Sequence, residues 1–138
     1  MRSVMIAGAI AAAALMACAD EGPTDETPEG ALSLFLASVN PAERTFDRER
    51  AYKLLAPENQ QELSKRAAKA SKVDGRSFEP SEMLVIERFV QRWPIKNMES
   101  EIDGDRAKVT AHGDKASQEA VVDLKRVDGR WRIVLPMD

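Results

Sequence analysis

The sequence has one cysteine, Cys18, and one histidine, His112, among its 138 residues. A single cysteine excludes a disulfide framework within the chain, and a single histidine argues against a metal site built on imidazole ligands. We therefore expect no cofactor, and a domain that is stabilised by packing alone. The formal net charge of -3 argues against a nucleic-acid-binding protein, because such proteins usually carry an excess of basic residues.

A hydrophobic run long enough to cross a bilayer is also lacking, although the chain begins with apolar residues. Residues 4–16 are uncharged, but a membrane-spanning helix needs about 20 apolar residues. Arg2 before this run and small residues at its end are typical of a secretory signal. The alternative is a helix of the folded domain, which would have to be buried on all sides because it has no polar face. We expect the chain to be exported.

The end of this leader, Leu15, Met16, Ala17 and Cys18, resembles the lipobox of bacterial lipoproteins. The resemblance implies transfer of a diacylglyceryl group to the Cys18 sulfur, cleavage before this residue, and acylation of the new amino group. Met16 is bulkier than the residue usual at its position. Several acyl chains would anchor the protein firmly, since each buried CH₂ contributes about 0.8 kcal/mol. The alternative is ordinary cleavage beside Ala17 or Ala19, which leaves a secreted protein with a free thiol.

The chain is therefore expected to have three parts. These are a signal peptide at residues 1–17, the lipidated Cys18 with a flexible acidic tether at residues 18–29, and a folded domain at residues 30–138. Residues 19–29 include five acidic residues, two prolines and one glycine, and they cannot bury enough apolar surface to fold. The protein would face the periplasm or the cell exterior. Ala19 rather than aspartate follows Cys18, which favours the outer membrane if the enterobacterial sorting rule applies.

The first half of the domain shows a helical pattern. Apolar residues at positions 32, 35, 36 and 39 share one helix face. We expect four helical segments, at residues 31–39, 46–55, 56–73 and from residue 80 onward. The pattern does not distinguish helix from strand at residues 87–93.

After Pro94 the apolar period changes to two, which predicts strands. Asp103 with Gly104, and Asp128 with Gly129, are typical of two-residue hairpin turns. Between the two hairpins the chain would turn again, so that the four strands form an antiparallel meander.

These turns fix the expected pairs. In the first hairpin they are Glu101 with Arg106 and Glu99 with Lys108, and in the second they are Leu124 with Ile133, Val122 with Leu135, and Arg126 with Trp131, where a cation–π contact is expected. Lys125 would lie opposite Arg132, with Asp123 as a diagonal counter-charge. The inward positions would be Met98, Ser100, Ile102, Ala107, Val109, Ala111, Val122, Leu124, Ile133 and Leu135.

We therefore predict an α+β fold in which three to four N-terminal helices pack on one face of a curved, roughly four-stranded antiparallel sheet. Residues 105–109 (DRAKV), 128–136 (DGRWRIVLP) and 52–58 (YKLLAPE) resemble the NTF2-like, cystatin-like α+β superfamily, and most closely its small DUF4878-type lipoproteins of bacteria. The resemblance implies a cone with an apolar mouth, which some members use for catalysis and others for ligands or partner proteins. A ligand would enter near Phe35, Tyr52, Phe89, Trp93, Trp131 and Ile133.

An isomerase of this fold needs an acid or base inside the cone. The predicted inward strand positions hold no carboxylate or imidazole except Asp105 at a turn, and His112 falls on the outer face. We interpret the protein as a non-catalytic, lipid-anchored module that binds a small apolar ligand or a protein. Two alternatives stay open: an enzyme like SnoaL or ketosteroid isomerase that uses Asp105, His112 or Tyr52, and a protein that forms a homodimer through the outer sheet face.

Overall fold

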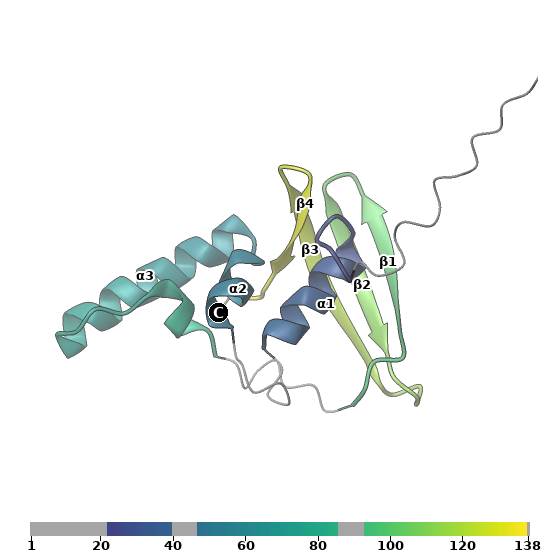
Figure 1. Cartoon of the computed structure of the whole chain (residues 1–138), viewed down its shortest axis with the longest axis horizontal. Helices are drawn as coiled ribbons and strands as arrows, with labels where there is room; N and C mark the ends of the chain where they lie inside the picture. The colour runs from purple at the N-terminus through teal and green to yellow at the C-terminus, as the bar shows by residue number, and fades with distance from the viewer. Residues whose placement is uncertain (1–21, 40–46, 86–92, 138) are drawn as a thin grey trace, which may run out of the picture.

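The computed structural model of the chain describes residues 22–39, 47–85 and 93–137 (Figure 1). The elements in these ranges are α1 (Pro28–Ser38), α2 (Arg48–Lys53), α3 (Pro57–Asp74), the 3-10 helix η2 (Pro80–Met83), β1 (Asn97–Asp103), β2 (Arg106–His112), β3 (Glu119–Val127) and β4 (Arg130–Val134). Helices precede strands, as the sequence predicts, and the α+β class is confirmed.

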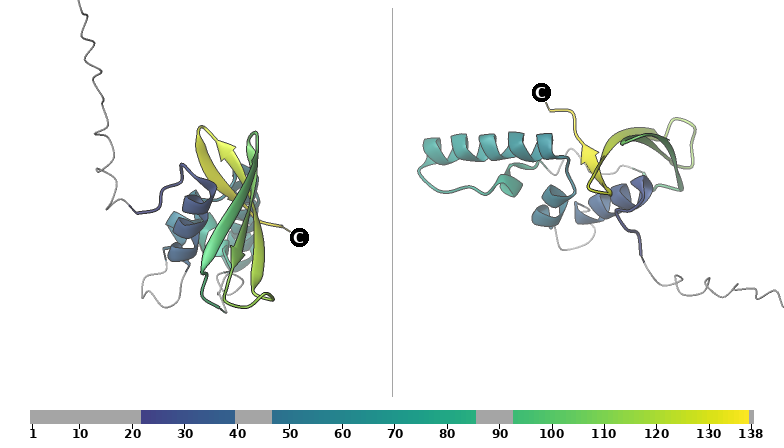
Figure 2. Two further views of the ribbon diagram at one scale, coloured as in Figure 1. Left: turned by 90° about the vertical axis from the view of Figure 1, so that its right-hand side faces the viewer. Right: turned by 90° about the horizontal axis from the view of Figure 1, so that it is seen from above.

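The four strands form one antiparallel sheet in the order β1-β2-β3-β4. The sheet curves around α1, which packs against β1, β2 and β4 (Figure 2). The helix α2 lies beside α1, whereas α3 extends away from the sheet together with η2 (Figure 1). The four-stranded antiparallel sheet is therefore confirmed. Of the described helices, however, one lies across its face, where the sequence predicted three to four.

The helix α1 begins at Pro28, two residues before the predicted start of the folded domain. Thr27 caps it, since its Oγ1 accepts a hydrogen bond of 3.0 Å from the Gly30 N–H, and Pro28 suits the first turn because it lacks an N–H. A Cβ atom on Gly30 would overlap the carbonyl oxygen of Thr24. The backbone of residue 24 thus lies against the first turn of α1, within the stretch that the sequence assigned to the tether.

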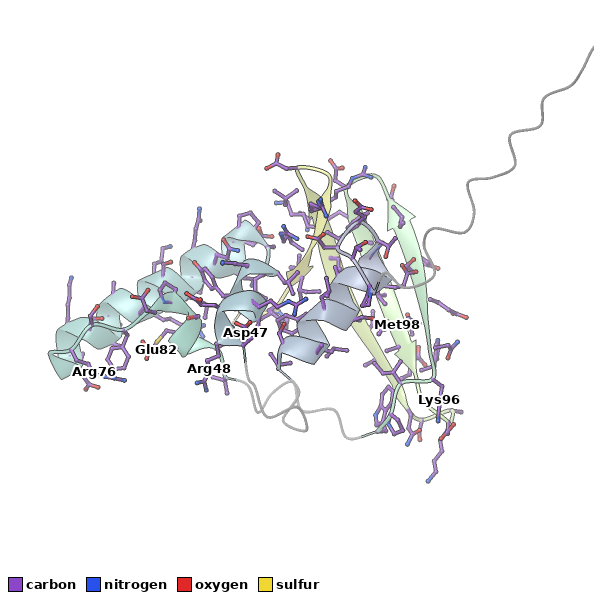
Figure 3. All side chains as sticks on the ribbon, viewed as in Figure 1. Asp47, Arg48, Arg76, Glu82, Lys96 and Met98 are labelled. Carbon is purple, nitrogen blue, oxygen red and sulfur yellow. The ribbon has the colours of Figure 1, made fainter. Side chains whose placement is uncertain are left out.

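The core lies between α1 and the concave face of the sheet. Leu32 and Phe35 on α1 are each 2% exposed. Met98 on β1 points towards α1, with its sulfur 3.9 Å from the Ser33 Oγ (Figure 3). The buried strand residues are Ala107, Val109, Ala111, Leu124, Trp131 and Ile133. These are predicted inward positions together with Trp131, whereas Ile102, at the end of β1, is 56% exposed.

The turn of the first hairpin differs from the prediction by one residue. Gly104 and Asp105 form it, rather than Asp103 and Gly104. Gly104 has a φ of 60°, and glycine at the first central position is typical of a type II′ turn. Arg126 on β3 holds this turn, because its side chain donates to Asp105 Oδ1 at 3.1 Å and its backbone N–H donates to the Asp105 carbonyl oxygen at 2.7 Å.

This turn shifts the pairing of β1 with β2. The predicted pairs of Glu101 with Arg106 and Glu99 with Lys108 are wrong, and Glu101 instead lies opposite Lys108, with Asp103 opposite Arg106. Because each partner moves by two residues, every side chain keeps its predicted face. Opposite charges therefore still meet across the strands.

The second hairpin has the predicted register, with Leu124 opposite Ile133, but its ladder ends at Val134, so the predicted pair of Val122 with Leu135 is not formed. Asp128 and Gly129 have φ values of 53° and 78°, and a positive φ at both central residues is typical of a type I′ turn. Arg126 lies opposite Trp131, with its guanidinium carbon 5.4 Å from the centroid of the indole ring. The predicted cation–π contact is confirmed.

Lys125 lies opposite Arg132, as predicted, but the counter-charges come from the helical half of the chain. Lys125 Nζ is 3.6 Å from the carboxylate of Glu58 on α3, and Arg132 Nη1 is 2.7 Å from the carboxylate of Asp25. The expected counter-charge, Asp123, lies opposite Lys108 on β2. The two like charges are thus accommodated by contacts that connect the sheet to α3 and to the N-terminal segment.

Candidate functional site

The three residues considered for proton transfer lie in separate surroundings. The Tyr52 hydroxyl on α2 is 3.4 Å from polar atoms of α3. His112 Nε2 on β2 is 3.6 Å from Glu99 Oε2 on β1, and Asp105 accepts its hydrogen bonds from Arg126. Since each has different neighbours on a different element, the structure does not bring them together.

Two of the six residues expected at the mouth of the cone line a common groove. These are Phe35 on α1 and Ile133 on β4. Trp131 is 2% exposed and belongs to the core. Tyr52 lines a separate surface pocket between α2 and α3.

The other two residues add nothing to this groove. Trp93 lies beside Gly113 in the turn between β2 and β3, where its Cε3 would be 2.8 Å from a Cβ atom on the glycine. Phe89 falls outside the described residues. A cavity formed by all six residues stays a prediction.

The groove that Phe35 and Ile133 share has a volume of about 380 Å³. It lies between α1 and the part of β3 that continues beyond the end of β4. Its lining is mainly aliphatic and comprises Leu32, Phe35, Leu36, Val121, Val122, Asp123 and residues 133–136.

One edge of β3 is open beside this groove. Pairing of β3 with β2 continues to Glu119 opposite His112, whereas pairing with β4 ends at Asp123 opposite Val134. No described strand pairs with residues 119–122 on the β4 side. Along about half of its length, β3 therefore has β2 on one side and no described strand on the other. The groove adjoins this half of β3.

The end of β4 has a physical reason in the sequence. Continuing the observed register would place Pro136 opposite Val121. Proline has no backbone N–H, so it cannot donate the hydrogen bond that the next step of the ladder requires. Pairing therefore stops at Val134.

Val121 directs its backbone polar groups towards the open side. The Arg126 N–H donates to the Asp105 carbonyl oxygen, on the side of β2. Backbone groups alternate between the two sides of an antiparallel strand, so even-numbered residues of β3 bond towards β2 and odd-numbered residues face the other way. Val121 is 58% exposed, and no described strand pairs with it on this side.

The outer edge of β4, by contrast, is covered. The Trp131 N–H donates to the Asp25 carbonyl oxygen at 2.9 Å. The Ile133 N–H donates to the carbonyl oxygen of Leu54 at 2.8 Å, and the Ile133 carbonyl oxygen accepts from the Ala56 N–H at 2.8 Å. A further strand could thus join this side of the sheet at β3 but not at β4.

The open edge is acidic on the outer face of the sheet. Glu119 and Asp123 lie two residues before and after Val121, so all three side chains share that face. Glu119 and Asp123 are exposed, and the described lining of the groove includes no lysine or arginine. The groove thus combines an apolar wall with a negatively charged outer rim.

Asp25 holds the N-terminal segment against the second hairpin. Its carboxylate accepts hydrogen bonds from Arg130 Nη1 at 2.6 Å and Arg132 Nη1 at 2.7 Å. Burial raises the pKa of Asp25, but the hydrogen bonds and positive charges of the two arginines outweigh it, so that its pKa lies below the ordinary value of 3.8. The same contact raises the pKa of Arg130. The cluster has a structural role at the start of the domain.

Two further hollows lie elsewhere on the described surface. One, of about 210 Å³, lies between α3, η2 and the residues after β4. The other, of about 430 Å³, lies on the outer sheet face, where Glu101, Asp103, Arg106 and Lys108 already meet as opposite charges across the strands. Neither is lined by residues 119–122, the part of β3 that has no described partner on the β4 side.

Within the described ranges, no group of three or more His, Cys, Asp and Glu side chains is arranged to hold a metal ion. Every buried side-chain nitrogen and oxygen atom in these ranges has a hydrogen-bond partner. None of the helices that the structure describes has the length and hydrophobicity needed to cross a membrane.

Comparison with known proteins identifies no relative: no family model matches the chain, and neither the curated proteins nor the solved structures include a significant match.

Sequence reasoning overlooked the open edge, although a signal for it was present. The register of the second hairpin was predicted correctly, and this register alone places Pro136 opposite Val121. The partners of Asp25 and of Asn59, a residue on α3 whose side chain binds the backbone of Leu135, had no such signal, because they lie far away in the sequence.

Proposed function

We propose that the chain is a lipid-anchored protein of the bacterial cell envelope whose domain binds a ligand or a partner without catalysis. In this proposal the domain is NTF2-like, and the groove between α1 and β3 is its binding site. The observation that carries the proposal is this mainly aliphatic groove of about 380 Å³ beside an open strand edge.

The chemistry of the lining supports binding rather than proton transfer. The one ionisable side chain in the described lining, Asp123, lies on the outer face of the sheet opposite Lys108. A general acid or base has to be held within hydrogen-bonding reach of its substrate. The inner wall of the groove instead consists of side chains such as Leu36 and Val122, which exclude water from an apolar group.

The lipobox supports the anchor, and the position of Thr24 limits its reach. Six residue steps separate Cys18 from Thr24, the residue that lies against α1. Fully extended, such a segment spans about 20 Å at most. A lipid on Cys18 would therefore keep the start of α1 close to the bilayer. Asp25 contacts β4 beside the turn at residues 128 and 129, whereas the open edge lies at the opposite end of β3.

The anchor is tested by mass spectrometry of the mature N-terminus in the wild type and in the Cys18→Ser variant. We expect the wild type to begin at Cys18 with diacylglyceryl and acyl groups attached and to fractionate with membranes. The variant should lack these groups and leave the membrane fraction after signal cleavage or remain as the uncleaved precursor. A wild-type protein that is soluble and unmodified would overturn the proposed anchor.

The groove is tested by binding of a fluorescent fatty acid to the mature protein in phosphatidylcholine nanodiscs. Leu36→Trp adds bulk inside the groove, whereas the matched Ala37→Trp adds the same side chain at the neighbouring exposed position. We expect Leu36→Trp to weaken binding by about tenfold, which corresponds to about 1.4 kcal/mol, and Ala37→Trp to leave it unchanged. Equal effects of the two substitutions would place the binding site elsewhere.

A further inference from the structure

The groove offers a partner two kinds of contact at once. Its wall presents aliphatic side chains of α1 and of the residues around β4, and it reaches Val121, whose N–H and C=O face the side of β3 that has no described partner strand. A small apolar ligand can use the wall alone. An extended peptide can use both, because its backbone can pair with Val121 while alternate side chains enter the groove.

We propose that the groove binds an extended segment of a partner protein, which joins the sheet as an additional strand beside residues 119–122. This inference rests on the proposed function and specifies the ligand of the same site. The added strand would continue the position of β4 beyond Val134, where no described strand pairs with β3. Its backbone hydrogen bonds would supply affinity, and its side chains would supply specificity.

The residues on the inner and outer faces of the sheet beside this edge indicate which side chains such a segment needs. On the inner face, its side chains would lie beside Val122, Leu36 and Leu135, which favours valine, isoleucine or leucine. On the outer face they would lie beside Glu119 and Asp123, which favours lysine or arginine. The expected partner sequence therefore alternates aliphatic and basic residues.

A second copy of this chain fits the edge less well. If two β3 edges paired antiparallel about Val121, Glu119 of each copy would lie opposite Asp123 of the other. Like charges directly opposite each other destabilise a strand pair, and this pairing would create two such contacts. A partner with the opposite charge avoids them.

The test uses an acetylated, amidated heptapeptide that alternates lysine and valine, with the mature protein in phosphatidylcholine nanodiscs. Zwitterionic lipid keeps the basic peptide from binding the membrane through charge alone. Binding is followed by fluorescence anisotropy of a labelled peptide, and hydrogen–deuterium exchange reports the protection of residues 119–122. We expect the peptide to bind and to slow exchange in this segment, and a peptide with glutamate in place of lysine to bind at least about tenfold more weakly.

Two substitutions at one position separate the backbone contact from the side chain. Val121→Pro removes the N–H that faces the open side, where proline is tolerated because no hydrogen bond between described residues is lost. Val121→Thr keeps the N–H and the β-branched shape. We expect Val121→Pro to weaken binding by about tenfold and Val121→Thr by less than about threefold. The circular dichroism of Val121→Pro and its binding of the fluorescent fatty acid check that it is folded; should it be unfolded, the alternating peptide with every second amide N-methylated replaces it.

The outcomes distinguish this inference from the proposed function. If the fatty acid binds and the peptide does not, the groove is a ligand site and the added strand is wrong. If neither binds, the proposed function of the groove is wrong as well. Equal binding of the peptide to Val121→Pro and Val121→Thr would also overturn the inference. So would slow exchange of the Val121 amide before any peptide is added, or a dimer that protects this amide.

Discussion

Asn59 on α3 forms two hydrogen bonds with the backbone of a single residue, Leu135, which follows β4. Its Nδ2 donates to the Leu135 carbonyl oxygen at 2.9 Å, and its Oδ1 accepts from the Leu135 N–H at 3.0 Å. Asn59 is 1% exposed. Its side chain thus bonds to the backbone of Leu135 in the way that a neighbouring strand would bond to the outer edge of β4. Together with Asp25 and residues 54–56, it covers this edge from Trp131 to Leu135.

Asn59→Ala should therefore lower the free energy of unfolding by a large amount for the substitution of a polar residue. It leaves the partly buried N–H and C=O of Leu135 without their partner, which costs about 1–3 kcal/mol. Gln61→Ala, at an exposed position of the same helix, is the matched control and should change stability by less than about 0.5 kcal/mol. Urea unfolding followed by circular dichroism measures both. Similar midpoints for the two variants would show that the Asn59 bonds contribute little.

The contact of Asp25 with Arg130 and Arg132 should make stability depend on pH. Because the folded state lowers the pKa of Asp25, its contribution is fully present above the unfolded value of about 3.8 and is lost as the pH falls through the folded value. Asp25→Asn should thus be about 1 kcal/mol less stable than the wild type at pH 7, and this difference should shrink below pH 4. Urea midpoints of both proteins at several pH values measure it.

The matched control for this prediction is Glu26→Gln. The Glu26 carboxylate is 3.9 Å from Arg130 and its side chain is 68% exposed, so its removal should change little at any pH. A constant difference between Asp25→Asn and the wild type from pH 7 to pH 3 would contradict the ionic origin of the effect.

The two hairpins show how far local sequence determines the sheet. Both contain the dipeptide Asp-Gly, and the alternation of apolar residues placed the inward faces correctly in each. The second hairpin uses Asp128 and Gly129 as its turn, as predicted. The first begins its turn at Gly104, where Arg126, 21 residues further along the chain on β3, bonds to Asp105. Alternation therefore predicts the faces, whereas the register also depends on a distant side chain.

Part of the candidate site could also be predicted from the sequence pattern. Phe35 and Ile133 were assigned to the mouth between the helices and the sheet, and they do line a common groove. Trp131 was assigned there from the fold resemblance and the apolar inner positions, but it is buried in the core on β4 of the second hairpin, where Arg126 lies against its ring. A pattern of residue types gives the inward direction of a side chain and not its depth, which depends on how α1 crosses the sheet.

The turn at Gly104 should tolerate few other residues. Its φ of 60° is unfavourable for residues with a Cβ atom, while the surrounding space is open, since a Cβ atom on Gly104 would meet nothing within 4 Å beyond its chain neighbours. Gly104→Ala should therefore cost about 1 kcal/mol through the backbone alone. Gly104→Asn should cost less, because asparagine adopts this conformation more readily. Thermal unfolding followed by circular dichroism ranks the three proteins, and a stability of the alanine variant equal to that of the wild type would show that the turn has rearranged.

Gly30 should control whether Asp25 reaches its arginines. A Cβ atom on Gly30 would overlap the carbonyl oxygen of Thr24, so Gly30→Ala should displace the segment that carries Asp25. Gly22→Ala, where a Cβ atom meets nothing within 4 Å, is the control and should be nearly neutral. If the displacement breaks the ion pairs, Asp25→Asn should cost about 1 kcal/mol in the wild type and almost nothing in the Gly30→Ala background. Additive effects in this double-mutant cycle, measured by urea unfolding at pH 7, would show instead that residues 24–27 adjust without releasing Asp25.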